Sequence, residues 1–156
     1  MNSLEMQIEG SYEKQAAMLE QLRDCLELER ESLIQVDVDQ LWEIMEKKNT
    51  LVVDIDKLGN EIKCLLNHCF EHSLEAPRAS ALREWPWFRE LSKRTTLLKE
   101  DIQVRLKENL SFIQDTLGFF NELVGIIAKS GAQEQGYEHL RNPQKMSEAR
   151  IYQREV

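Results

Sequence analysis

Residues 41–69 have the sequence LWEIMEKKNTLVVDIDKLGNEIKCLLNHC, and the spacing of their apolar side chains decides the fold. These side chains recur in alternating steps of three and four residues, with Lys48 at the one polar position. They are Leu41, Ile44, Leu51, Ile55, Leu58, Ile62, Leu65 and Cys69. Such a period is typical of an α-helix that packs along another helix, because a strand would place alternate residues on one face.

Two further stretches with helical periodicity flank this one. We expect a first helix over about residues 3–35, a second over 38–71 and a longer third over 86–129. Asp37 can cap the second helix, and the tight turn that this implies makes the first two helices an antiparallel hairpin. The sequence therefore predicts an all-α fold, a coiled-coil-like antiparallel three-helix bundle over residues 1–131, with the second helix in the middle.

The third helix begins at an aromatic cluster, Trp85-Pro86-Trp87-Phe88, which we expect to cover the open end of the bundle. Between Leu98 and Leu110 its apolar side chains recur in successive steps of four, through Ile102 and Leu106. Steps of four in place of the three–four alternation predict a stutter, where the supercoil locally unwinds.

The end of the chain has a different composition. Ser130 and Gly131 should terminate the third helix, because glycine is a poor helix former. Residues 132–156 are polar with scattered apolar side chains, and they cannot bury enough surface to order themselves. We therefore expect a mobile C-terminal tail.

Composition and charge exclude several classes of function. A formal net charge of -8 argues against a nucleic-acid partner, and no apolar run is long enough for membrane insertion. The N-terminus carries Glu5 and Glu9 and lacks a basic, apolar leader, so no secretory signal is expected. Three cysteines without a disulfide framework (Cys25, Cys64 and Cys69) favour a cytoplasmic protein.

Candidate chemistry is sparse. Cys64, His68 and His72 share one helix face near Cys69, but a structural zinc site needs four ligands that converge on one point. The chain has no glycine-rich phosphate loop and no nucleophile in a recognisable setting. We therefore expect no metal, no cofactor and no enzymatic activity.

Two apolar stripes lie side by side near the end of the third helix. One consists of Ile113, Leu117, Phe120, Val124 and Ile127, and the other of Phe112, Thr116, Phe119, Leu123 and Ile126. One stripe is enough for packing on a hairpin, so the doubled face favours a partner helix, with burial in the core or in a homodimer as the alternative. We expect the partner to contact Phe112, Phe119, Leu123 and Ile126, while Phe120 and Ile127 are shared between the core and the partner.

Several motifs resemble the FlgN family of flagellar export chaperones. The succession E-R-x-x-L, D-x-x-x-L and x-x-K-x-x-L occupies residues 29–33, 37–41 and 46–51. The third helix follows with Asn109 and, seven residues later, Thr116-Leu117, and the tail contains Gly136-Tyr137. The resemblance covers about residues 12–137.

The resemblance implies a cytoplasmic chaperone for the hook-associated proteins of the hook-filament junction. It would bind their C-terminal amphipathic helix, prevent premature assembly and deliver them to the flagellar type III export gate, with Tyr137 as the candidate contact with the gate. Two alternatives stay open: a chaperone of the filament-cap type, and a structural adaptor or homo-oligomeric coiled coil. We expect a monomer or a weak homodimer.

Overall fold

The computed structural model describes residues 3–70 and 82–141, with side chains as far as residue 133. Three long helices make up the fold: α1 (Ser3–Gln35), α2 (Val38–Phe70) and α4 (Pro86–Arg141). No strand occurs among these residues, and none of their helices is long and apolar enough to cross a membrane. The predicted all-α fold with three long helices is confirmed. The chain divides into two units, Met1–Ser111 and Phe112–Val156.

The helical hairpin of α1 and α2 is the foundation of the first unit. The apolar stripe predicted on α2 is its inner face: Ile44, Leu51, Leu58 and Ile62 are buried, and the other positions of the stripe are half-buried. Burying a leucine or isoleucine side chain contributes about 1.5–3 kcal/mol, so this stripe is the main attachment of α2. Against it lies Cys25 of α1, which forms one core cluster with Ile44 and Leu51.

The turn between α1 and α2 contains the helix cap predicted at Asp37. The amide of Gln40 donates to Oδ1 of Asp37 at 3.1 Å, so Asp37 is the N-cap of α2. The amide of Asp37 donates to the carbonyl of Ser32 at 2.9 Å, which closes the end of α1. Between the helices Val36 has a φ of 58°, a left-handed conformation that costs a β-branched residue about 1–2 kcal/mol. The hairpin therefore reverses the chain through one strained residue.

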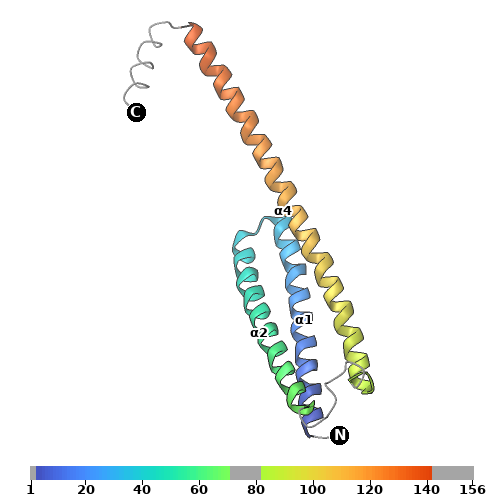
Figure 1. Cartoon of the computed structure of the whole chain (residues 1–156). Helices are drawn as coiled ribbons and strands as arrows, with labels where there is room; N and C mark the ends of the chain where they lie inside the picture. The colour runs from blue at the N-terminus through green and yellow to red at the C-terminus, as the bar shows by residue number, and fades with distance from the viewer. Residues whose placement is uncertain (1–2, 71–81, 142–156) are drawn as a thin grey trace, which may run out of the picture. The chain divides into compact units, whose positions relative to one another are not determined.

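The central helix of the first unit is α1, and the prediction that α2 is central is wrong. Figure 1 shows α1 between α2 and the first part of α4. Cys25 and Leu26 are adjacent and both 1% exposed, yet Cys25 packs toward α2 while Leu26 forms a second cluster with Leu98 and Ile102 of α4. A helix with neighbours on two sides must bury two faces, whereas the single regular stripe of α2 serves one neighbour.

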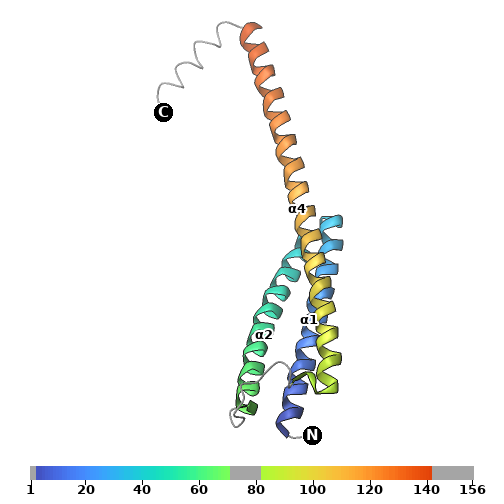
Figure 2. The same cartoon turned by 45° about the vertical axis from the view of Figure 1, so that its right-hand side comes forward.

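The first part of α4 runs parallel to α1 and antiparallel to α2. Contacts between α1 and α4 advance in the same direction along both helices, from Glu20 with Arg94 to Arg30 with Glu108. The two views in Figures 1 and 2 agree on this up-down-up order.

The predicted stutter in α4 is wrong. Leu106 and Leu110 are 45% and 55% exposed, so they do not continue the packed face. The inward positions after Ile102 are instead Arg105, which is half-buried, and Asn109, which is 3% exposed. The three–four alternation is therefore regular, and two polar residues on the packed face concealed it in the sequence.

The aromatic cluster at the start of α4 packs on the first part of α1. The ring of Tyr12 lies 6.1 Å from that of Trp87 and 5.4 Å from that of Phe88 between centroids. Nε1 of Trp87 donates to Oε1 of Glu5 at 3.4 Å. Burial beside these rings raises the pKa of the Tyr12 hydroxyl above its ordinary value. The cluster thus joins the first turn of α4 to α1.

In the second unit α4 continues to Arg141 and does not end at Lys129 as predicted. Gly131 costs about 1 kcal/mol relative to alanine, but Ala128, Lys129 and Ala132 beside it are good helix formers. A single glycine in such a setting weakens the helix without ending it. Residues 142–156, most of the predicted tail, lie outside the described residues.

Candidate functional site

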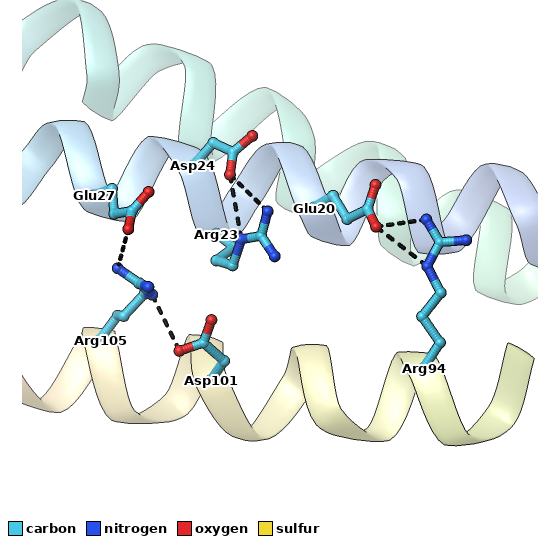
Figure 3. A network of polar contacts seen from close by, with 7 residues as sticks. All are labelled: Glu20, Arg23, Asp24, Glu27, Arg94, Asp101 and Arg105. Atoms are coloured by element: carbon cyan, nitrogen blue, oxygen red, sulfur yellow. Dashed lines mark hydrogen bonds and ion pairs between the residues drawn. The ribbon is translucent and has the colours of Figure 1, made fainter.

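Ion pairs connect α4 to α1 along the segment that α1 covers. Figure 3 shows Arg94 reaching Glu20, with Nε 3.2 Å from Oε1, and Arg105 placed between Glu27 and Asp101. Nη1 of Arg105 lies 2.9 Å from Glu27 and its Nε lies 3.1 Å from Asp101. Burial acts to lower the pKa of Arg105, but the hydrogen bonds and charges of Asp101 and Glu27 outweigh it and raise the pKa. These pairs hold α4 in one register along α1.

A polar layer joins all three helices at Asn109. Nδ2 of Asn109 donates to the carbonyl of Leu26 at 3.0 Å and to Oε2 of Glu29 at 2.9 Å. The other carboxylate oxygen of Glu29 pairs with Nζ of Lys48 on α2. Both N–H groups of the buried amide are therefore used, and a buried polar residue that is satisfied in only one register specifies that register.

The packed face of α4 continues in the same heptad register beyond Asn109. Its positions in the first unit alternate in steps of four and three; they are Leu91, Thr95, Leu98, Ile102, Arg105 and Asn109. The same alternation places Phe112, Thr116, Phe119, Leu123 and Ile126 next. The first set packs against α1, whereas the second belongs to the second unit. The heptad pattern that packs on α1 in the first unit thus continues into the part of α4 that belongs to the second unit.

This extension is exposed and strongly apolar. Phe119 is 61% exposed and Leu123 and Ile126 are also exposed, while Phe112 is half-buried. Phe119 and Phe120 meet edge to face with ring centroids 6.3 Å apart. Thr116 donates to the carbonyl of Phe112, so its hydroxyl is satisfied within the helix. Exposed apolar surface of this kind is typical of interaction sites in soluble proteins.

The second stripe is exposed as well. Phe120 and Ile127 are 57% and 65% exposed, so they are not shared with a core as predicted, and Leu117 and Val124 beside them are similarly exposed. Counting back from Phe119 in steps of four and three would have shown that the other stripe is in register with Ile102. We define the apolar face of the second unit as the two stripes together, residues 112–127.

Two other predicted features are outside this face. Tyr137 lies within α4, but its side chain is outside the described side chains. Cys64 is exposed and Cys69 half-buried, and His72 lies outside the described residues. Among the side chains that the structure describes, no three His, Cys, Asp or Glu residues are placed to hold a metal ion.

Comparison with protein families gives a match over most of the chain. The family model described as FlgN protein matches residues 1–143 of the chain. Comparisons with curated proteins and with solved structures give no match.

Proposed function

This chain belongs to the FlgN family of flagellar export chaperones, and from that premise we propose that its clients are the hook-associated proteins of the hook-filament junction. The apolar face of the second unit would bind the C-terminal amphipathic helix of these proteins in the cytoplasm. Bound in this way, a client could not assemble prematurely, and it would be delivered to the export gate.

The observation that supports this proposal is the exposed apolar face itself. Side chains of this face recur in the same steps of four and three as the side chains of α4 that α1 covers in the first unit. An amphipathic helix is therefore the partner that suits the face. Phe119, Leu123 and Ile126 provide large apolar contacts of the kind that dominate binding energy at interfaces. A client helix with its own apolar stripe would aggregate if left bare, and this contact would cover it.

A titration with a client segment tests the proposal. Phe119→Asp with Leu123→Asp places two charges on the face, and the affinity for the C-terminal segment of a junction protein should fall by at least about a hundredfold, since each buried unpaired charge costs several kcal/mol. The matched control is Gln114→Asp with Asn121→Asp, which adds the same charge at exposed positions outside the two stripes. The proposal is wrong if both double variants bind as the unaltered chain does.

Sedimentation of the unaltered chain and of the same double variant tests the homo-oligomeric alternative. If the apolar face joined two copies of this chain, the unaltered protein would sediment as a tight dimer and Phe119→Asp with Leu123→Asp would sediment as a monomer. A client of the junction type instead predicts a monomer or weak dimer that forms a heterodimer with the segment. A filament-cap segment that bound more tightly than a junction segment would favour the filament-cap alternative.

For delivery, we propose that Tyr137 contacts the export gate. A tyrosine offers a large apolar area and a polar tip at low conformational cost. Tyr137→Ala should leave the affinity for the client segment unchanged and reduce capture of the chaperone–client complex by the cytoplasmic part of the gate. Equal capture of the two proteins would remove Tyr137 from this role.

A further inference from the structure

Charged residues border one edge of the packed face of α4 at every seventh position. They are Arg94, Asp101, Glu108, Asp115, Glu122 and Lys129. We call this set the charged row. Its first three members belong to the first unit and its last three to the second. The first unit therefore shows which side chains a covering helix, α1, places beside the charged row.

Over the first unit α1 places opposite charges beside the charged row. Glu20 pairs with Arg94, the basic member of the row. Figure 3 shows the carboxylate of Asp101 pointing toward α1, where Arg23 lies beside its own neighbour Asp24. Seven residues further along α1, Nη1 of Arg30 donates to the backbone carbonyl of Glu108 at 3.4 Å. Arg23 and Arg30, seven residues apart on α1, thus lie on the side of α1 that meets the acidic members of the row, although the carboxylate of Asp101 itself pairs with Arg105 of α4.

In the second unit the row has two acidic residues beside the apolar face, followed by Lys129 just beyond the end of that face. Asp115 lies three residues after Phe112 and four before Phe119, and Glu122 lies three after Phe119. Residues at these spacings are neighbours on a helix surface, so both carboxylates adjoin the bound partner. Both side chains are exposed. The opposite edge of the face carries Gln114 and Asn121 at the corresponding positions and is uncharged.

We propose that the helix bound on the apolar face carries a lysine or arginine at the two positions, seven residues apart beside its own apolar stripe, that meet Asp115 and Glu122. This inference rests on the proposed function and names a chemical property of the client. Complementary charges at the edge of an interface increase the association rate and select among partners that share an apolar stripe. The client helix would thus repeat the charge pattern with which α1 meets Asp101 and Glu108.

A second copy of this chain does not meet this requirement. In an antiparallel pair of α4 helices the rows would face each other, and the one basic residue of each second unit's row, Lys129, could meet only one of the two carboxylates Asp115 and Glu122. In a parallel pair the row would face the positions of Phe120 and Ile127, which are apolar. A basic amphipathic helix is therefore the occupant that fits both the face and its border.

Three synthetic peptides, each about three heptads long, test the charge preference against the full chain. They share one apolar stripe and carry lysine, glutamine or glutamate at the positions that flank it. Fluorescence anisotropy at low salt should rank the affinities as lysine, then glutamine, then glutamate, with about tenfold between the first and the last. The ratio should shrink toward one in high salt, because the pairs are exposed.

Two double variants with the same change in net charge locate the effect. Asp115→Asn with Glu122→Gln should remove most of the preference for the lysine peptide. Gln114→Lys with Asn121→Lys, on the uncharged edge, should retain the rank order of the three peptides. The inference is overturned if the lysine peptide keeps its advantage after the first change, or if the three peptides bind the unaltered chain equally.

The peptide experiments separate two hypotheses: the charge rule, meaning the preference for basic flanking residues, and the apolar face as the binding site. Equal binding of the three peptides that is lost in Phe119→Asp with Leu123→Asp retains the apolar face and refutes the charge rule. Binding of the lysine peptide that is unaffected by Phe119→Asp with Leu123→Asp refutes the apolar face as the binding site. Absence of binding by all three peptides refutes the inference, because the face would then not accept a generic basic helix.

Discussion

The two segments of α4 on either side of residue 111 have the same spacing of packed-face residues but differ in how far these residues are exposed. Leu98 and Ile102 in the first segment are 7% and 6% exposed, while Phe119 and Ile126 in the second are 61% and 62% exposed. All four occupy positions of one uninterrupted heptad pattern. The difference is the neighbour: α1 covers the first segment and so uses its apolar area for folding, whereas the area of the second remains available to a partner.

The segments also differ in their polar content. The covered segment contains Arg105 and Asn109 on its packed face, each with partners on α1. Between residues 112 and 127 the exposed segment has one polar residue on the equivalent face, Thr116, and its hydroxyl bonds within its own helix. Polar pairs specify the register of a permanent contact, whereas a face of aromatic and aliphatic side chains can accept more than one partner.

The largest expected effect comes from truncating one apolar side chain in each segment. Leu98→Ala should lower the free energy of unfolding by about 2–4 kcal/mol, because it leaves a cavity between α1 and α4. Phe119→Ala should change it by less than about 0.5 kcal/mol, since most of the side chain is already in water. Urea unfolding followed by circular dichroism measures both.

The truncations should have the reverse order of effect on client binding. Phe119→Ala should weaken binding of the client segment, while Leu98→Ala should leave it unchanged at temperatures where the variant is folded. Comparable destabilisation by the two substitutions would mean that the second segment is also packed in solution.

A smaller effect is expected at the polar layer. Asn109→Ala leaves the carbonyl of Leu26 and one oxygen of Glu29 without their donor, which should cost about 1–3 kcal/mol of stability. Thr116→Ala, one heptad further along, removes a hydroxyl that bonds within its own helix and should cost less than about 0.5 kcal/mol. Urea midpoints provide the comparison, and equal midpoints would show that the layer contributes no stability.

The smallest effect is expected from the glycines of the second segment. Gly118 and Gly125 have no atoms near the position of an added Cβ, so Gly118→Ala and Gly125→Ala should each stabilise the helix locally by about 1 kcal/mol. Amide hydrogen exchange should slow over residues 112–133, while the urea midpoint of the first unit stays the same.

Gly59→Ala in α2 is the control for the glycine substitutions. Its added Cβ would lie 3.9 Å from Nε2 of Gln15, an ordinary contact, so the change should raise the urea midpoint of the first unit. A midpoint that rose instead with Gly118→Ala would show that the two segments of α4 unfold together.

Local features of the fold were predictable from the amino-acid sequence. Alternation in steps of three and four marked the inner face of α2, and Asp37 marked its cap, because both depend on residues a few positions apart. The start of α4 at Pro86 followed from the restricted backbone of proline. The doubled stripe likewise indicated an apolar face before its exposure was known.

The predicted stutter was wrong because polar residues occupy packed positions of α4. Arg105 and Asn109 occupy the packed face of α4, so the apolar pattern of the sequence falls instead on Leu106 and Leu110 and predicts a stutter that does not exist. A buried polar residue is recognisable only by its partners, here Glu27 and Glu29, which lie far away in the sequence.

The amino-acid sequence alone establishes that this chain forms long amphipathic helices joined by a hairpin, because helix periodicity and capping are local properties. Only the tertiary structure shows that α1 is the central helix and that α1 covers Leu98 and Ile102. A heptad pattern predicts that a helix face packs against another helix, but it does not identify that helix. That choice depends on contacts between residues far apart in the chain, such as Leu26 with Asn109.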